Sequence, residues 1–435
     1  MLCSIVVVVV VHLLLIDRLR FEQGVLAIEL NDYEPRIFDH IPAHCHDCLS
    51  YRDIIFTQLT EIPERAFVNF NLGPRDTFMI LNGRTRLNFH PYAFQSLIIN
   101  KPNGTLTLTL AAPNSWLNIT ENTFHGLDLR PYSTFRIIIK YVYGCKFSKD
   151  SLSGIHMGKS SRLIIDVSSV TEVHFDRHVI GENDWNSSVE FHFSRMETIR
   201  FDSFSFASLI RRANENLSFH FQLVSHVHFK SYSFQSLKLR SSSSIKFHGL
   251  FLTRLTIDSY AFENMFLESN AVFNMTIGAF GTWLCLKSYS FHSLQTPVHS
   301  ENVLVYLEFF GVRGLSVLSH AFANLSLNHY RNHLQIHSIN PFNDRNLVVN
   351  LAADTFSSKT PASILMNFSH IHLLHFEQKA LPIDLIKYEI FLKDVNFVDL
   401  SFIEFDRIQS SFRFYFDGIR WIRWSNISMN DEKRT

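Results

Sequence analysis

The sequence HCHDCLS at residues 44–50 brings together side chains that can ligate zinc: His44, Cys45, His46, Asp47 and Cys48. Thiolate and imidazole are the ligands that zinc prefers. Adjacent residues rarely point at one metal ion, however, and no second Cys/His pair follows at the spacing of a zinc finger. We therefore expect an N-terminal cap over residues 21–55, with Cys45 and Cys48 as disulfide candidates, and predict no metal ion or cofactor.

Enzymatic signatures are missing from the sequence, which contains no GxSxG, GxGxxG, P-loop or HExxH motif. An enzyme of the parallel β-helix type would need carboxylates that converge on one face. Asp166, Glu172 and Asp176, or Asp202 and Asp258, would be the candidates, but the chain alone does not place them together. We predict a protein without catalytic residues.

A short phrase recurs through most of the chain and indicates which elements position these side chains. It reads HVHFKSYSFQSL at residues 226–237 and RLTIDSYAFENM at residues 254–265. Its Phe, or an aliphatic substitute, recurs every 25 to 34 residues, at Phe67, Phe94, Phe124, Leu152, Ile180, Phe206, Phe234, Phe262, Phe291, Phe322, Phe356 and Leu381. Such a period predicts a stack of about 12 to 14 coils of about 28 residues over residues 56–430, followed by a polar tail at 431–435.

Within each unit, apolar and polar residues alternate, as in FRIIIKYVY at residues 135–143. Alternation of this kind predicts a strand whose every second side chain faces inward. A short extended piece such as VHF follows, and then a segment that places Phe and Leu three positions apart, which predicts a short helix or 3₁₀ turn on the outer wall. The predicted fold class is a repeat solenoid, mainly parallel β with short outer helices or turns.

The segment TEIPERAFVNF at residues 60–70 resembles the LxxIPxxAFxxL half of an extracellular leucine-rich repeat. Later copies keep its spacing of five between Ile and Phe. The units are longer than usual, rich in Phe and mostly without the Asn of that repeat, which is similar to the degenerate repeats of arthropod secreted proteins. The resemblance implies a leucine-rich-repeat-like solenoid. The alternative coil shape is a right-handed parallel β-helix.

The recurring Phe predicts a buried spine, in which each ring packs on its counterparts in the coils above and below. The middle residue of each short strand faces outward instead. This column runs through Asn88, Asn118, Lys146, His174, Arg200, His228, Thr256, Cys285, Ser316, Asn350, His375 and Glu404. From it we select the candidate binding face: His174, Arg200, His228, Thr256, Ser316, Asn350 and His375.

The remaining cysteines test this assignment of inward and outward positions, because Cys145 takes an inward position and Cys285 an outward one. They lie five coils apart, too far for a disulfide. We predict that they are not bonded to each other, with Cys285 free or bonded to another molecule.

The N-terminus indicates the compartment. Residues 1–20 carry an apolar stretch from Ile5 to Ile16, shorter than a membrane-spanning helix, which predicts a secretory signal peptide or an uncleaved anchor. Sequons for N-linked glycosylation begin at Asn103, Asn118, Asn186, Asn216, Asn274, Asn324, Asn367 and Asn426. Both signals predict a secreted or membrane-anchored glycoprotein.

The balance of charged residues bears on which classes of partner the protein can bind. Forty basic residues match 40 acidic ones, so no overall positive field favours nucleic acid, and membrane contact is expected only through the N-terminus. We expect a non-catalytic protein that binds an extracellular protein through an extended solenoid surface. The alternatives are a parallel β-helix that binds or processes polysaccharide, and a structural extracellular component.

Overall fold

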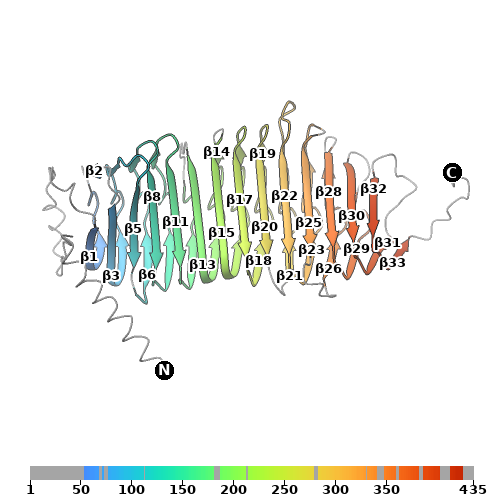
Figure 1. Ribbon diagram of the computed structural model, residues 1–435, viewed down its shortest axis with the longest axis horizontal. Helices are drawn as coiled ribbons and strands as arrows, with labels where there is room; N and C mark the ends of the chain where they lie inside the picture. The colour runs from blue at the N-terminus through green and yellow to red at the C-terminus, as the bar shows by residue number, and fades with distance from the viewer. Residues whose placement is uncertain are drawn as a thin grey trace, which may run out of the picture.

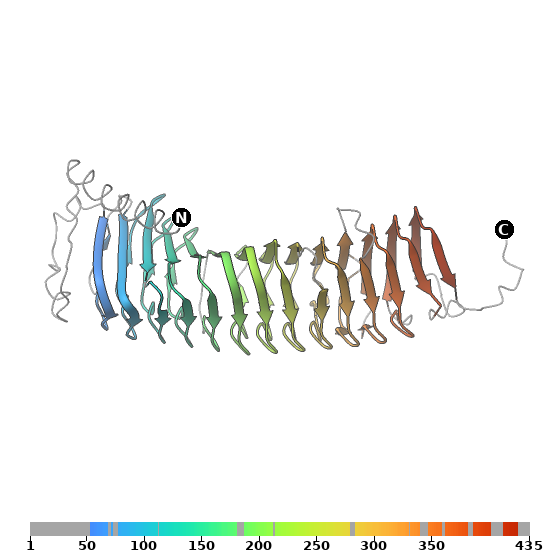
Figure 2. The same ribbon diagram turned by 90° about the horizontal axis from the view of Figure 1, so that it is seen from below.

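The chain forms a parallel β-solenoid, whose strands follow one another along the long axis of the molecule (Figures 1 and 2). The computed structural model describes residues 53–67, 71–72, 77–111, 113–180, 187–211, 214–278, 283–329, 331–339, 347–358, 362–381, 386–401 and 412–424. Within these ranges no residue is helical. The repeat solenoid is therefore confirmed, with the coil shape of a parallel β-helix.

A first row of strands forms the long side of the coils. Its members are β1 (Asp53–Ile62), β3 (Thr77–Phe89), β5 (Thr105–Ala111), β8 (Thr134–Lys140), β11 (Arg162–Ser168), β13 (Ser188–Phe201), β15 (Asn216–Phe229), β17 (Ser244–Leu250), β20 (Val272–Gly278), β22 (Leu304–Phe310), β25 (His333–Ile339), β28 (Ala362–Ser369), β30 (Ile386–Lys393) and β32 (Phe412–Asp417). Each pairs in parallel with the next, as Phe219 of β15 does with Phe247 of β17.

A second row of short strands belongs to the same 24-stranded sheet. It contains β6 (Trp116–Ile119), β9 (Gly144–Phe147), β12 (Glu172–Phe175), β18 (Arg254–Ile257), β21 (Trp283–Leu286), β23 (Gly314–Val317), β26 (Val348–Leu351), β29 (Leu373–Phe376), β31 (Phe397–Leu400) and β33 (Trp421–Trp424). The ends of β1, β3, β13 and β15 continue into this row.

Shorter pairings close the coil. They involve β2 (Asn71–Leu72), β4 (Ile98–Ile99), β7 (Asp128–Leu129) and β10 (His156–Met157), then β14 (Ile210–Arg211), β16 (Lys238–Leu239) and β19 (Phe266–Leu267), and finally β24 (Phe322–Leu325) with β27 (Phe356–Ser358).

The predicted Phe spine is confirmed. The ring of Phe234 is fully buried and stacks between Phe206 and Phe262, with ring centroids 5.0 and 5.2 Å away. The stack continues through Phe291 to Phe322, at 5.0 and 5.1 Å. Inward strand residues pack against this spine, so one apolar core runs along the solenoid.

The outer segments are hydrogen-bonded turns, and the expected short outer helices are absent from the described residues. Tyr232 and Ser236 have φ angles of 64° and 57°, in the left-handed region, so a right-handed helix cannot continue through either. The amides of Phe234 and Ser236 instead donate to Ala261 and Glu263 of the next coil. Bonds between coils thus alternate with bonds inside the turn, such as that from the amide of Gln235 to the carbonyl of Tyr232.

The last coils are shorter than the sequence period suggested. Asp399 of β31 pairs with His375 of β29, only 24 positions earlier, and Arg423 of β33 continues the column. The expected continuation at Glu404 was therefore wrong, and residue 404 lies outside the described ranges. A period of about 28 residues per coil therefore placed the expected column residue beyond Asp399, its true position.

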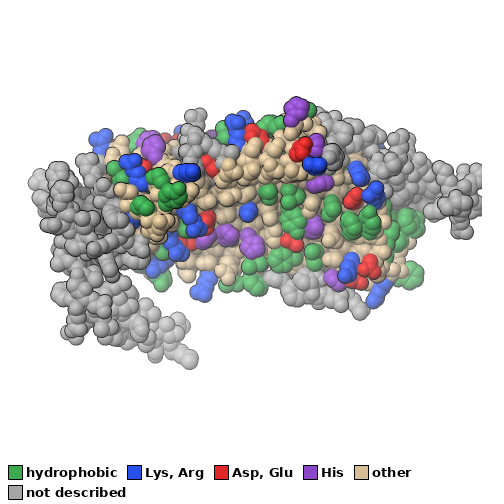
Figure 3. Space-filling view, turned by 45° about the horizontal axis from the view of Figure 1, so that its top comes forward, with side chains coloured by type: hydrophobic (Ala, Val, Ile, Leu, Met, Phe, Trp, Pro, Cys, Tyr) green, Lys and Arg blue, Asp and Glu red, His purple; other side chains and the backbone are tan. Residues whose placement is uncertain are grey.

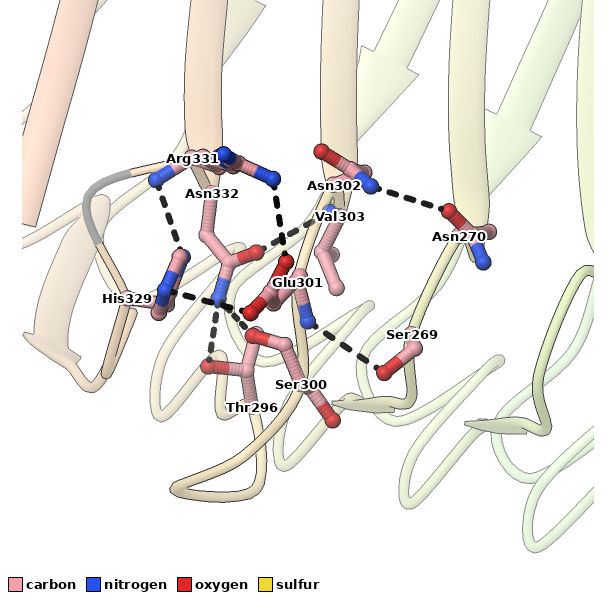
Figure 4. A network of polar contacts seen from close by, with 10 residues as sticks. All are labelled: Ser269, Asn270, Thr296, Ser300, Glu301, Asn302, Val303, His329, Arg331 and Asn332. Atoms are coloured by element: carbon pink, nitrogen blue, oxygen red, sulfur yellow. Dashed lines mark hydrogen bonds and ion pairs between the residues drawn. The ribbon is translucent and has the colours of Figure 1, made fainter.

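A buried asparagine fixes one corner between β20, β22 and β25 (Figure 4). Asn332 is fully buried, and its Oδ1 accepts the amide of Val303 at 3.0 Å. Its Nδ2 donates to the carbonyl of Ser300 at 2.9 Å and to Oγ1 of Thr296 at 3.3 Å. Near it, Arg331 forms an ion pair with Glu301. Asn332 thus satisfies backbone groups that would otherwise be buried without partners.

Candidate binding surface

The predicted binding face forms one continuous column on the short strands, here called the short-strand column. Its residues occupy equivalent register positions and are half-buried: His174, Arg200, His228, Thr256, Ser316, Asn350 and His375. Cys285 lies between Thr256 and Ser316. The placement is confirmed because alternation along each short strand turns the middle side chain away from the core.

Carboxylates accompany the histidines of this column. Nε2 of His228 lies 2.9 Å from Oδ2 of Asp258, and Nδ1 of His375 lies 3.3 Å from Oδ2 of Asp399. His174 contacts Glu172 at 3.0 Å. Such pairs orient the imidazole rings and keep the surface polar.

Arg200 differs from its neighbours in the column. It pairs in register with His174 on one side and His228 on the other. Its Nε is buried and has no hydrogen-bond partner in the described structure. The residue as a whole is half-buried, and a guanidinium group can form paired hydrogen bonds with a carboxylate.

Two of the carboxylates considered for catalysis, Asp202 and Asp258, alternate with lysines. Asp202, Lys230, Asp258 and Lys287 follow the short strands at equivalent positions in successive coils. Lys230 pairs with Asp202, and Lys287 lies 2.6 Å from Asp258. Asp202 and Asp258 are thus separated by a coil and neutralised by basic partners. Within the described ranges, no group of His, Cys, Asp and Glu side chains could hold a metal ion.

The long strands carry a charged cluster that the sequence did not reveal. Nδ1 of His192 lies 2.9 Å from Asp166, and its Nε2 lies 3.4 Å from Glu190. Arg136 and Arg162 pair with the same two carboxylates. The strand register is the signal that could have revealed this cluster, because Asp166 and His192 are paired residues on β11 and β13.

The contacts within this cluster shift the pKa values of its own side chains. The hydrogen bonds that His192 donates to Asp166 and Glu190 raise its pKa to about 9. The hydrogen bond from His192, helped by Arg162, lowers the pKa of Glu190 to about 2 despite partial burial. Farther along this row, burial and the nearby His192 lower the pKa of His220. Figure 3 shows histidines gathered beside acidic and basic side chains on this part of the surface.

Replacing His192 with Gln should destabilise the protein in a pH-dependent manner. The folded pKa of His192 exceeds its unfolded value of about 6.5. Its contribution is therefore complete below about pH 6.5 and is lost as the pH rises through about 9. The stability difference between wild type and His192→Gln, measured by urea unfolding, should be large at pH 6 and small at pH 10.

His220→Gln provides the opposite control. Because the pKa of His220 is lowered, its protonation is penalised in the folded state as the pH falls. This variant should gain stability relative to wild type at acidic pH. Equal pH profiles for the two variants would contradict the assignment of the carboxylate contacts to His192.

The sequons fall in different surroundings. Asn103 and Asn216 are exposed, whereas Asn118, Asn274, Asn324 and Asn367 are half-buried. Asn186 and Asn426 lie outside the described residues. Glycosylation at these positions stays a prediction.

The burial of Cys145 and Cys285 agrees with the predicted inward and outward positions. Cys145 is buried and Cys285 half-buried, and both are free. Burial raises the pKa of the Cys145 thiol well above its usual range. Cys45 and Cys48, the 1–20 segment and the 431–435 tail lie outside the described residues. None of the described residues forms a helix able to cross a membrane.

The strand register and the outward columns define a parallel β-solenoid protein. No family model, curated protein or solved structure matches the chain.

Proposed function

We propose that this is a secreted or membrane-tethered glycoprotein that binds another protein through the short-strand column. The observation that carries the proposal is the alignment of seven outward positions, from His174 to His375, along one side of the solenoid. Stacked coils of this kind offer an extended surface and need no deep pocket for binding. The proposal includes no catalytic step.

Arg200 and His228 form the centre of the proposed contact. Arginine is enriched among residues that dominate binding energy, because its planar group can form paired hydrogen bonds with carboxylates. Arg200 as a whole is half-buried and lies between His174 and His228 in the column, so such a contact would involve the outward part of its guanidinium group. An acidic or amide-rich protein surface is therefore the expected complement.

The test is a binding screen of the mature protein against extracellular domains, followed by affinity measurements on a double variant. Arg200→Ala with His228→Ala should weaken binding by at least about tenfold, or about 1.4 kcal/mol. The matched control is His156→Ala with Lys159→Ala, which removes a histidine and a basic residue from exposed positions in and beside β10.

Two results would overturn the proposal. One is equal affinity for the two double variants, which would place the contact elsewhere. The other is a uniformly negative screen combined with measurable turnover of a glycan. Filaments in solution sizing, without a bound partner, would favour the structural alternative.

A further inference from the structure

A ladder of aromatic rings runs along the outer turns, separate from the short-strand column. It consists of His178, Phe204, Tyr232, Tyr260, Tyr289 and His320, here called the aromatic ladder. From Phe204 to His320 the ring centroids are 5.1 to 5.4 Å apart. The three tyrosine rings are within 8° of parallel.

The backbone holds these rings at one ring per coil. The ladder residues have positive φ angles, from 48° at His178 to 64° at Tyr232. The amide of Tyr232 donates to the carbonyl of Tyr260, and the amide of Tyr260 donates to that of Tyr289, both at 3.1 Å. Side-chain stacking and inter-coil hydrogen bonds therefore share one period. The ladder is a preorganised array, so little ordering would be needed on binding.

The ladder presents edges and hydroxyl groups to a ligand, because each ring face is covered by the next ring. The tyrosines are half-buried. Burial and the neighbouring phenols Tyr289 and Tyr232 raise the pKa of Tyr260, as expected for closely aligned hydroxyl groups. Serines precede the ladder residues at Ser231, Ser259, Ser288 and Ser319, and these are also half-buried. The surface thus repeats hydroxyl groups along the solenoid axis.

A row of planar polar side chains runs beside the ladder. Nε2 of Gln235 donates to Glu263 at 2.7 Å, and Glu263 lies 3.5 Å from Nδ1 of His292. Nε2 of His292 contacts the amide of Asn324 at 2.6 Å. The ring of His292 also meets Tyr260 and Tyr289 edge-on, at 6.2 and 5.6 Å. Amide, carboxylate and imidazole groups bordering aromatic rings suit a ligand that carries many hydroxyl groups.

The charges next to the ladder favour a neutral ligand. Lys230 and Lys287 precede the ladder by two positions, and each is paired with an aspartate. Asp202 and Asp258 alternate with Lys230 and Lys287 along this edge, so a polyanion would gain little from it. The ligand is expected to bind through hydrogen bonds and apolar contact.

We propose that the aromatic ladder binds an extended, neutral β-1,4-linked glycan along the solenoid axis. In such a chain each sugar advances by nearly the distance that separates two rungs and is turned by half a revolution from the one before it, so every second sugar would meet equivalent groups. Tyr232, Tyr260 and Tyr289 would exchange hydrogen bonds with sugar hydroxyl groups. Gln235 and His292 would orient the chain from one side.

The experiment compares retention on insoluble cellulose, chitin and mannan, and calorimetric binding of the matching hexasaccharides and disaccharides. The test variant is Tyr232→Phe with Tyr260→Phe and Tyr289→Phe, which keeps the stacked rings and removes three hydroxyl groups. The wild type should bind at least one of the three glycans, and bind its hexasaccharide at least tenfold more tightly than its disaccharide. The variant should lose at least tenfold in affinity.

The matched control changes three exposed tyrosines outside the ladder to Phe: Tyr132, Tyr141 and Tyr143. It should bind like the wild type in the same glycosylation state, and thermal unfolding should show all three proteins folded. No retention of the wild type on any glycan would overturn the proposal. Equal losses in the two triple variants, or equal affinity for disaccharide and hexasaccharide, would also overturn it.

Discussion

Replacing Phe234 with Ala should lower the free energy of unfolding by about 3 to 5 kcal/mol, the range observed for buried Phe. The ring is fully buried and stacks on Phe206 and Phe262. It also meets Phe219 and Phe247 edge-on, at 5.8 and 5.4 Å. Truncation therefore removes apolar contacts with three successive coils and leaves a cavity that the rigid backbone ladders cannot close.

Urea unfolding measures this loss, and hydrogen exchange locates it. Stability in repeat proteins is carried by contacts between neighbours, so protection should fall first around β13, β15 and β17. Phe251→Ala is the matched control, because that Phe is 51% exposed at a corner. It should change stability by less than about 1 kcal/mol. A similar cost for both variants would contradict the spine as the main source of stability.

Replacing Asn332 with Ala should cost about 3 kcal/mol, since three hydrogen bonds would be lost and buried groups left without partners. The amide of Val303 and the carbonyl of Ser300 would both lose their contact with the side chain. The expected result is a lower urea midpoint and faster exchange of the Val303 amide.

Arg331→Ala, at the adjacent residue, tests whether the effect is specific to burial. Its ion pair with Glu301 joins two largely exposed side chains, with 52% and 46% exposure. Surface pairs of this kind contribute about 0 to 1 kcal/mol. If Arg331→Ala were as costly as Asn332→Ala, the corner would depend on its surface charges and not on the buried amide.

Much of the fold was predictable because it depends on local alternation and on one recurring residue. The buried positions of FRIIIKYVY and the Phe spine required only the period of two and the coil period of about 28 residues. The turns were mistaken for short helices, because residues such as Tyr232 and Ser236 carry no glycine-like signal for their left-handed backbone. Their conformation is decided by bonds to the next coil, which a single turn does not encode.

The candidate site was predictable in part for the same reason. The short-strand column follows from counting positions, so His174, Arg200 and His228 were placed together correctly. The cluster of His192 with Asp166 and Glu190 depends on exact register between coils of unequal length, which spacing alone did not resolve. Asn332 occurs once and follows no period, so its role became visible only from its partners.

The left-handed corners have a consequence for how such a chain can change over time. Leu223 and Phe251 adopt φ angles of 55° and 58°, conformations that bulky residues avoid on their own. Each corner is therefore imposed by the coils beside it, which act as a template. A new coil inserted between existing ones would inherit its path from them, even if its sequence had drifted far. Length and surface chemistry can then diverge while the cross-section is copied from coil to coil.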